Sequence, residues 1–404
     1  MNDWDRPLAD NSNDNALSKK IILPLALLCG LMLCGVLGWL AVGFGSDKLG
    51  QYLFDQAVAD AAKGSQQAAI KEFTFAIWLK PADPKIPLAR GIVYRDLQDL
   101  PHALEDFTKV IQLDPQNAEA YDNRGWVNSL SGNYEQAIAD YSQAILLVPN
   151  YANALLNRAT AYRDTGSLKQ ALEDYDAAQR FDPGDFEIYI GRGYAYSSLG
   201  SWDKALEDYK KAVQLAPDES EPYFWRGHAY LMTEAYGTAI YDFNKALALT
   251  PKDTETSKIY DDRGYCYQQT NNFDQAVKDY SEAIRQNSRD TYALGQRGYI
   301  YTVQKNYQDA ITDFNNSIQL KPDDPQNFYN RAYCNYSLAN YSDAVQDYSK
   351  AIELKPDYAD AYYSRGLSYN HLSKPDLAQA DFKKALELCA GTSLCKDIKA
   401  QLKP

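Results

Sequence analysis

A unit of 34 residues repeats almost from end to end of this chain of 404 residues. One copy, from Ala118 to Pro149, reads AEAYDNRGWVNSLSGNYEQAIADYSQAILLVP. Gly132 can end a helix in its first half, because glycine tolerates the left-handed backbone that follows a last turn, and Pro149 cannot continue the helix before it. Between them, small and apolar residues recur at steps of three and four, as on the buried face of a helix: Ala137, Ile138, Tyr141, Ala144, Ile145 and Val148. The unit therefore predicts two consecutive helices.

Two markers count the copies independently. The first is an arginine followed by glycine or alanine in the first helix: Arg90, Arg124, Arg158, Arg192, Arg226, Arg263, Arg297, Arg331 and Arg365. The second is an acid followed by an aromatic residue in the second helix: Glu72, Asp106, Asp140, Asp174, Asp208, Asp242, Asp279, Asp313, Asp347 and Asp381. Both markers advance by 34 residues, with one step of 37 where Arg263 follows Arg226, so ten helix pairs are expected.

A 34-residue helix-turn-helix period with small residues, an aromatic residue and a closing proline at fixed places resembles the tetratricopeptide repeat (TPR) family, over roughly Asp47 to Pro404. The resemblance implies an all-α fold, a right-handed superhelical solenoid of about ten helix pairs in which each pair packs only on its neighbours. We expect the pairs at residues 47–80, 84–115, 118–149, 152–183, 186–217, 220–251, 257–288, 291–322, 325–356 and 359–390. Leu394, Ile398 and Leu402 recur every four residues and predict a capping helix at 392–404. Unrelated proteins share this scaffold, so the fold alone names no function.

An apolar run without charges, residues 21–45, precedes the repeats. Its 25 residues would form a helix of roughly 37 Å, enough to cross a hydrocarbon core of about 30 Å. The alternative is a cleaved signal peptide, with Ala41-Val42-Gly43 as its cleavage site. We favour a retained single-pass transmembrane helix, because the run is longer than a usual signal core. The polar residues 1–20 before it are expected to be disordered.

The charges that flank this run predict the side of the membrane. Lys19 and Lys20 lie directly before it, whereas Asp47 and Lys48 cancel just after it. Basic residues favour the cytoplasmic side, so we expect a cytoplasmic N-terminus and a solenoid on the extracytoplasmic side.

Two regions depart from the pattern of the other repeats: the first pair and the residues from Pro251 to Arg289. In the first pair Gln56 stands where later copies carry arginine, and Glu72 replaces aspartate, as is common in terminal repeats. Three extra residues lie between Pro251 and Arg263, and the next junction, residues 287–289, lacks its proline. The region from Pro251 to Arg289 is therefore predicted to change the superhelix path or to form an exposed loop.

The composition offers little material for catalysis or for nucleic-acid binding. The net charge is −13, whereas a nucleic-acid backbone is bound by clustered Lys and Arg. His102, His228 and His371 are the only histidines in the sequence, and none has a cysteine or another histidine at ligand spacing. We therefore predict no enzyme, no cofactor, no metal site and no nucleic-acid partner.

The recurring arginine and acid suit structural pairing. Each arginine lies 16 residues before the acid of its own copy and, in regular copies, 18 residues after the acid of the preceding one. Either spacing could bring a guanidinium fork to a carboxylate across a helix contact. No pair differs from the rest as a catalytic pair would, so we expect these pairs to set the spacing of the repeats.

Two cysteines, Cys389 and Cys395, flank Gly391 at the turn into the last helix. A disulfide there would staple the cap to the solenoid, and it would persist only in an oxidising compartment; two free thiols are the alternative. Cys266 and Cys334 recur at one first-helix position and are expected to be buried spacers.

The remaining candidate for function is a surface. In the TPR family the first helices line the concave face, and the resemblance implies that the position two after the arginine points into it. Aromatic residues and one histidine gather at and near that position from about the fifth pair onward, with one earlier tryptophan: Trp126, Tyr194, Phe224, Trp225, His228, Tyr265, Tyr299, Tyr329, Tyr333 and Tyr363. Such rings are enriched at binding hot spots. The alternative is that they stack on the next repeat.

The favoured hypothesis is a membrane-anchored scaffold or adaptor that binds a protein or peptide segment in its concave groove and helps to assemble a complex at the membrane. One alternative is a non-catalytic regulatory subunit of a membrane or envelope enzyme. Another is a structural protein that self-associates into a homo-oligomer through its open ends.

Overall fold

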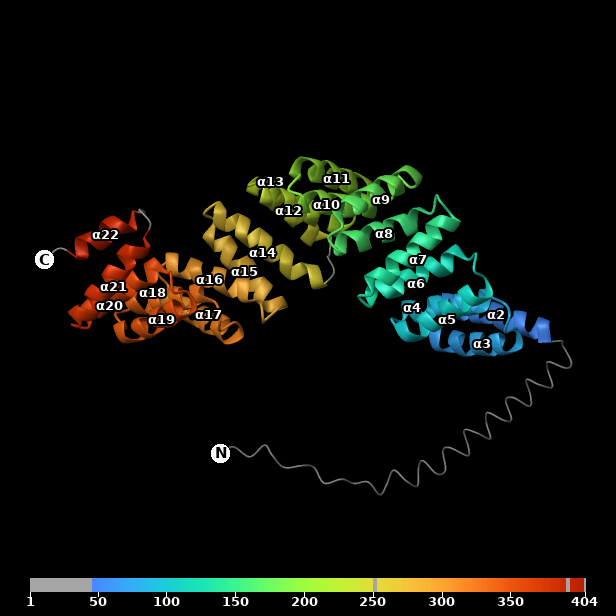
Figure 1. Ribbon diagram of the computed structural model, residues 1–404, viewed down its shortest axis with the longest axis horizontal. Helices are drawn as coiled ribbons and strands as arrows, with labels where there is room; N and C mark the ends of the chain where they lie inside the picture. The colour runs from blue at the N-terminus through green and yellow to red at the C-terminus, as the bar shows by residue number, and fades with distance from the viewer. Residues whose placement is uncertain (1–45, 250–252, 390–392, 403–404) are drawn as a thin grey trace, which may run out of the picture. The chain divides into compact units, whose positions relative to one another are not determined.

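The computed structural model describes residues 46–249, 253–389 and 393–402. All regular structure in these ranges is helical, and helices α2 to α22 follow one another in packed pairs (Figure 1). The predicted all-α fold of paired helices is therefore confirmed. Contacts divide the chain into two units, residues 1–183 and 184–404, and each is described by itself.

The first unit contains eight of the described helices: α2 (Ser46–Ala62), α3 (Gln66–Leu79), α4 (Lys85–Asp96), α5 (Leu100–Leu113), α6 (Ala118–Leu130), α7 (Tyr134–Leu147), α8 (Ala152–Asp164) and α9 (Leu168–Phe181). The second unit contains the remaining thirteen: α10 (Phe186–Ser198), α11 (Trp202–Leu215), α12 (Ser220–Met232), α13 (Tyr236–Ala248), α14 (Asp253–Gln269), α15 (Phe273–Gln286), α16 (Thr291–Val303), α17 (Tyr307–Leu320), α18 (Pro325–Ser337), α19 (Tyr341–Leu354), α20 (Ala359–His371), α21 (Pro375–Leu388) and α22 (Leu394–Gln401).

The helix ends follow the two sequence markers throughout the described pairs. Every first helix that carries the marker arginine ends six residues after it, as α6 ends at Leu130 after Arg124. Every second helix begins six residues before its marker acid, as α7 begins at Tyr134 before Asp140. The same two-helix unit is therefore built in register from α2 to α21.

A left-handed residue lies in the turn inside each pair. Gly132 has φ of 76° in the third pair, and Gly64, Gly166 and Gly200 occupy the same position in three other pairs. The remaining six pairs place a residue with a side chain there, with φ between 55° and 63°: Gln98, Glu234, Asn271, Lys305, Ala339 and Ser373. The turn is therefore kept at the expense of local backbone strain.

Each pair is held together by a small core between its two helices. In the third pair Ala137, Tyr141 and Ala144 are fully or almost fully buried. A Cβ atom at Gly125 would lie 2.8 Å from the ring of Tyr141, so the close helix contact requires glycine there. Val148, which the periodicity placed on the same buried face, is 39% exposed, because α7 ends at Leu147 and the chain leaves the helix.

The first helices form one layer of each unit. Within the first unit α2, α4, α6 and α8 contact one another in order, and within the second α10, α12, α14, α16, α18 and α20 do so. No comparable contact joins consecutive second helices in the described part of either unit. The pairs are therefore closer together along their first helices, which line the inner face of each unit.

A ladder of ion pairs runs through the repeats. Each of the nine marker arginines donates from Nε and Nη2 to both oxygens of the acid 16 residues later, with Nη2–Oδ1 distances of 2.6–2.8 Å. In several rungs Nη1 also reaches the preceding second helix, as from Arg90 to Thr74 at 2.8 Å. Of the two spacings that the sequence allowed, the pair forms within a copy, and the third donor links that copy to the one before.

The three extra residues after Pro251 lengthen a helix. Helix α14 has 17 residues, whereas its neighbours α12 and α16 have 13, and it still ends six residues after Arg263. Helix α14 is therefore longer by just over one turn at its N-terminal end, and residues 250–252 lie outside the described ranges.

The two ends of the repeat array differ from its interior. In the first pair Gln56 is exposed, and Oε2 of Glu72 is buried without a hydrogen-bond partner. Burial and the charge of Asp60 raise the pKa of Glu72. At the other end α22 packs on α21 through Ile398, and Cys389 and Cys395 form a disulfide with their Cα atoms 5.7 Å apart.

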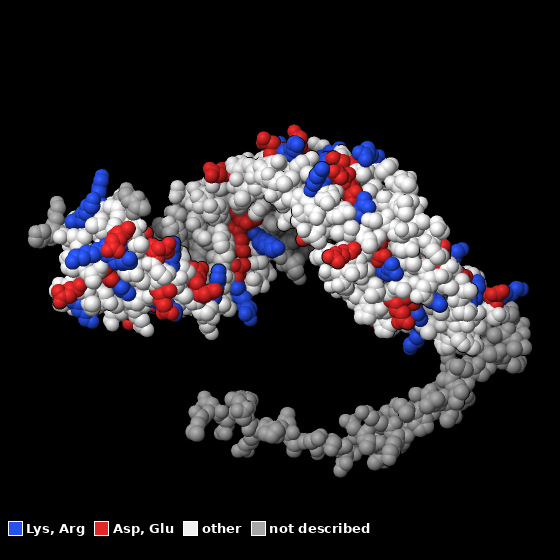
Figure 2. Space-filling model, viewed as in Figure 1, with Lys and Arg blue, Asp and Glu red and all other residues white. Residues whose placement is uncertain are grey.

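The predicted leader and membrane span, residues 1–20 and 21–45, lie outside the described ranges. Among the helices from α2 to α22, none combines the length and the apolar character needed to span a bilayer. On the face drawn in Figure 2, acidic and basic side chains of the described residues are interspersed, without an extended basic area.

Candidate functional site

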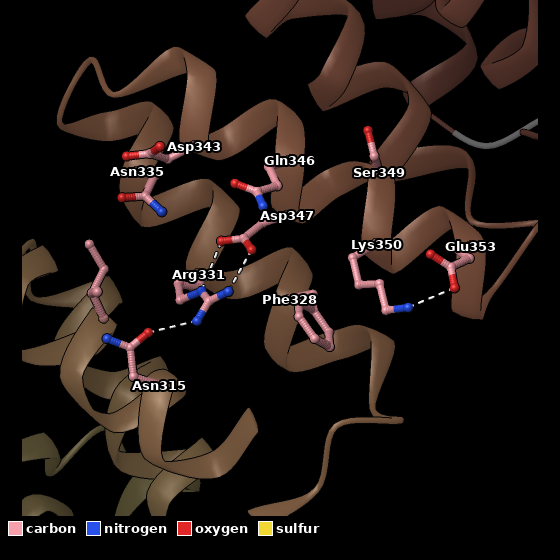
Figure 3. Close-up of a pocket in the computed structure, with 11 residues that line it drawn as sticks. Asn315, Phe328, Arg331, Asn335, Asp343, Gln346, Asp347, Ser349, Lys350 and Glu353 are labelled. Atoms are coloured by element: carbon pink, nitrogen blue, oxygen red, sulfur yellow. Dashed lines mark hydrogen bonds and ion pairs between the residues drawn. The ribbon is translucent and has the colours of Figure 1, made fainter. Parts of the chain in front are cut away.

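The first hollow to consider belongs to the ion-pair ladder. It has a volume of about 660 Å³ and surrounds Arg331 and Asp347, with Asn315 of α17 accepting from Arg331 Nη1 at 2.7 Å (Figure 3). A hollow of about 600 Å³ surrounds Arg90 and Asp106 in the second pair in the same way. Because such a hollow occurs at more than one rung of the ladder and its arginine and aspartate are already paired with each other, we regard it as a feature of the repeat.

A different hollow lies on the inner face of the second unit, and we call it the Trp225 cavity. It has a volume of about 650 Å³, within the range of ligand sites. Four first helices, α10, α12, α14 and α16, contribute its lining: Tyr194, Glu221, Phe224, Trp225, His228, Lys258, Asp261, Asp262 and Tyr292. Four of these nine residues are among those predicted to bind a partner.

Aromatic rings form one wall of the Trp225 cavity. The ring of Trp225 meets that of Tyr194 edge to face, with 5.3 Å between centroids, and lies 5.1 Å from that of Phe224. Trp225 also lies parallel to the buried ring of Tyr209, 6.5 Å away, and donates from Nε1 to Glu221 at 3.2 Å. Packing and this hydrogen bond fix the orientation of Trp225, so the wall is formed before any ligand arrives.

Carboxylates from α14 also line the Trp225 cavity. Asp262 accepts a 2.8 Å hydrogen bond with His228 Nδ1. Oδ1 of Asp261 is buried and has no hydrogen-bond partner. Burial raises the pKa of Asp261 to about 8, and the charges of Asp290 and Asp262 act in the same direction. A hydrogen bond with Asp290 also raises this pKa, so only one oxygen of the Asp261 carboxyl group has no partner.

A second, smaller hollow adjoins the first, and we call it the amide cavity. Its volume is about 340 Å³, and it is lined from α14, α16 and α18 and the residues just before α18: Gln268, Thr291, Tyr292, Gly295, Gln296, Tyr299, Asp324, Gln326, Asn327 and Asn330. Gln268 donates to Gln296 at 3.1 Å and accepts from the hydroxyl of Tyr280 at 3.1 Å. Tyr292 lines both hollows, so the two are adjacent, and together we call them the inner groove.

The other predicted residues divide into three groups. Tyr299, 46% exposed, and Tyr333, 43% exposed, present their rings to solvent, and Tyr299 lines the amide cavity. Tyr265, Tyr329 and Tyr363 pack on other rings instead, at 6.4 Å from Tyr236, 5.5 Å from Tyr348 and 5.8 Å from Phe382. Trp126 lies in the first unit, with the guanidinium of Arg95 over its ring. The predicted aromatic strip is therefore interrupted, because some of its rings fill contacts between helices.

Five residues of the lining were not predicted from the sequence: Glu221, Lys258, Asp261, Asp262 and Tyr292. Asp261 occupies the position two before the marker arginine, where the preceding copy carries Phe224. That change from an aromatic residue to an acid was a usable signal. Tyr292 lies in the first turn of α16, outside the register positions from which rings were chosen, and only the structure brings it to the cavity.

The groove offers rings, amides and carboxylates to a ligand. The lining of the Trp225 cavity includes no serine, threonine or cysteine beside His228, whose Nδ1 is bonded to Asp262. This arrangement is suited to binding through stacking, hydrogen bonds and charge.

Comparisons with known proteins agree with the repeat structure. A family model described as TPR repeat matches residues 193–233 and 335–372, and models described as tetratricopeptide repeat match residues 107–139, 131–186, 262–325 and 359–390. Together these ranges cover more than half of the chain. A search of curated proteins found no match.

Solved structures of TPR proteins are similar to this chain. The C-terminal part of a TPR repeat-containing protein from Cytophaga hutchinsonii has 20% identity and a TM-score of 0.51, covering 62% of this chain and 100% of that one. A crystal structure of MamA has 27% identity and a TM-score of 0.39, covering 42% and 93%. A thermophilic TPR protein of Thermus thermophilus has 26% identity and a TM-score of 0.38, covering 43% and 94%. The chain belongs to the tetratricopeptide repeat family.

Proposed function

We propose that this chain is a membrane-tethered TPR scaffold that binds an extended segment of a partner protein along the inner groove. The observation that carries the proposal is the pair of adjoining hollows on one layer of first helices, joined at Tyr292. Rigid rings give contact area at low entropic cost, and amides can meet the polar groups of a backbone. In this role the chain is a non-catalytic adaptor.

An extended segment fits this groove because several consecutive first helices line it. The Trp225 cavity draws on α10 to α16, and the amide cavity on α14 and α16 and on α18 with the residues before it, so a ligand that fills both crosses several helices. An extended peptide places successive side chains along such a row, whereas a compact ligand would fill one hollow. The exposed ring of Tyr299 then lies along the route of the segment.

Site-specific photo-cross-linking tests the groove. A photoreactive phenylalanine analogue replaces Tyr299 in the full-length chain within its own membrane, and cross-linked peptides are identified by mass spectrometry. We expect one defined segment of one partner to be attached at Tyr299. The control places the same analogue at Tyr241, a 57% exposed tyrosine of the second helix α13. Equal capture at both positions, or no reproducible segment at Tyr299, would refute groove binding.

The membrane tether and its orientation are part of the same proposal. The uncharged run at 21–45 and the lysines before it support a retained span with the repeats on the extracytoplasmic side. The disulfide between Cys389 and Cys395 supports an oxidising compartment for them. Intact cells treated with protease should lose a C-terminal tag, and a maleimide reagent should label these two cysteines only after reduction. A protected tag would reverse the orientation, and release of the protein at high pH would indicate a cleaved leader.

A regulatory subunit of a membrane enzyme would use the same groove, and the identity of the cross-linked partner distinguishes the two roles. If the captured segment belongs to an enzyme whose rate changes on adding this chain, the regulatory role replaces the scaffold role. Self-association is tested in the same experiment, because a segment of this chain itself would then be recovered.

A further inference from the structure

We propose that the Trp225 cavity is a receptor for the side chain of an arginine in the bound segment, with the guanidinium held between the aromatic wall and the carboxylates of Asp261 and Asp262. This proposal rests on groove binding by a partner segment and names the chemistry of that segment.

The charge of the cavity favours a cation. Glu221, Asp261 and Asp262 line it, and Asp290 interacts with Asp261, whereas Lys258 is the one lysine or arginine in the lining. Asp261 lines the cavity and its Oδ1 has no hydrogen-bond partner, so a ligand donor that reaches this carboxyl group would add a hydrogen bond that the folded chain lacks. An apolar side chain would leave that acceptor unsatisfied, and an anionic one would add repulsion.

The aromatic wall favours a planar cation. A guanidinium stacks on aromatic faces and donates two parallel hydrogen bonds to carboxylates, which an ammonium cannot do. The chain itself uses this combination in its ladder, where Arg226 binds Asp242 and lies 5.5 Å from the ring centroid of Tyr223. Arg263 does the same with Asp279 and with Tyr260 at 5.4 Å. The Trp225 cavity presents rings and carboxylates, and its lining includes no arginine.

The adjoining amide cavity accounts for the rest of the segment. It carries side-chain amides from three elements, including Gln296 and Asn330, next to the exposed ring of Tyr299. These groups can donate to and accept from a peptide backbone without selecting its sequence. The arginine of the bound segment would therefore provide the selectivity. The amide cavity would add affinity by contacting the residues of the segment on one side of that arginine.

Binding of a guanidinium should release a proton. Burial raises the pKa of Asp261 to about 8, so near neutral pH this carboxyl group is mostly protonated until a cation arrives. The groups around it are Lys258 and Asp262 on its own helix, Glu221 and His228 on α12, Tyr280 on α15, Asp290 before α16, and Tyr292 on α16. The negative charges of Asp290 and Asp262 disfavour ionisation of Asp261. The positive charge of a bound guanidinium would favour ionisation, so Asp261 would lose its proton when the ligand binds.

A display library of random peptides about 12 residues long, selected on the full-length chain in detergent, provides the probe. We expect the enriched peptides to share one arginine at a fixed position. A synthetic peptide from this set, with that arginine replaced by citrulline, should bind about tenfold or more weakly, because citrulline keeps the shape and loses the charge. Arginine stays charged at every pH used, and an acetylated N-terminus removes the titration of the peptide's α-amino group.

Matched protein variants locate the effect. Asp261→Asn and Asp262→Asn keep the size of each side chain. Each should lower the affinity for the arginine peptide and leave the affinity for the citrulline peptide unchanged. Affinity of the unmodified chain should rise about tenfold between about pH 7 and about pH 9, and Asp261→Asn should remove this rise. Asp343→Asn, at a carboxylate on α19 outside the groove, is the control and should change nothing. Circular dichroism verifies that each variant remains folded.

The outcomes separate this proposal from groove binding itself. Enriched peptides that lack a basic residue but lose affinity on Tyr299→Ala would refute the arginine receptor and leave the groove intact. Equal binding of the arginine and citrulline peptides would also refute it. No enriched peptide, or enriched peptides unaffected by both Tyr299→Ala and Asp261→Asn, would overturn the groove and the receptor together.

Discussion

One rung of the ion-pair ladder, Arg90 with Asp106, allows a quantitative test of what these pairs do. Arg90 donates to Asp106 at 2.8 and 2.7 Å and to Thr74 at 2.8 Å, so it links α4 to α5 and to the preceding α3. The side chain of Asp106 is only 4% exposed and that of Arg90 18%. Burial raises the pKa of Asp106 although the guanidinium opposes this, so desolvation of the carboxylate offsets much of the attraction.

This balance between desolvation and attraction predicts that the two single substitutions lower the free energy of unfolding by different amounts. Arg90→Met leaves a buried carboxylate unpaired and should lower the local free energy of unfolding by about 3 kcal/mol. Asp106→Leu leaves a guanidinium that can still reach water and Thr74, so the loss should be smaller, about 2 kcal/mol. The double variant removes both charges and should lie within about 1 kcal/mol of the natural chain. The coupling free energy would then be about 4 to 6 kcal/mol.

The assay must read stability locally, because a long repeat array need not unfold in one step. Amide hydrogen exchange with mass spectrometry gives the opening free energy of peptides from α3, α4 and α5, and peptides from α18 and α19 provide the internal control. A double variant as unstable as Arg90→Met would show that the pair is a net source of stability. A loss below about 1 kcal/mol for Arg90→Met would show that the carboxylate is not effectively buried.

Three further substitutions test separate features. Gln56→Arg restores the missing ladder arginine opposite Glu72, whose Oε2 has no hydrogen-bond partner. It should raise the opening free energy of α2 and α3, measured by hydrogen exchange, by about 1 to 2 kcal/mol. No gain would mean that a guanidinium at this position cannot reach Glu72. Ala339 has a left-handed backbone with φ of 62°, so Ala339→Gly should stabilise its helix pair by about 1 kcal/mol. Gly132→Ala should destabilise the third helix pair by a similar amount. Stability changes of the same sign in both variants would contradict this reasoning. Because folding raises the pKa of Asp261 to about 8, its contribution to stability is fully present below about pH 4, decreases as the pH rises toward 8 and is constant above that value. Exchange in α14 should therefore speed up over this range relative to Asp261→Asn, and an identical pH profile in both proteins would exclude the effect.

Much of the fold could be predicted from the sequence, because the markers are part of the mechanism that spaces the helices. The arginine and the acid bond to each other, so their period is also the period of the helix pairs and fixes where each helix ends. The periodicity failed at Val148, because a residue just past the end of a helix no longer follows the helical rotation. It also could not show that the insertion near Pro251 would extend α14, since extra residues can lengthen either a loop or a helix.

The candidate site could be predicted only in part. The register placed Tyr194, Trp225 and His228 on first helices, and all three line the Trp225 cavity. It could not show which rings face solvent, because that depends on the size of side chains in the adjacent pair. Tyr329 lies between Tyr348 and Tyr358, whereas Tyr333, one turn later, is exposed. Asp261 and Tyr292 come from different pairs, and no spacing rule connects them.

Helix α22 has a consequence for how copies of this chain can associate. In the earlier pairs, each second helix packs against the first helix of the next pair. Helix α22 takes the place of that first helix on α21, with Ile398 and Leu394 in the same apolar cluster as Phe382. A fibre of chains joined head to tail would need that side of α21 free. With that side occupied, a fibre cannot grow by continuing the repeat array of one chain into the next, so any homotypic complex must use other surfaces.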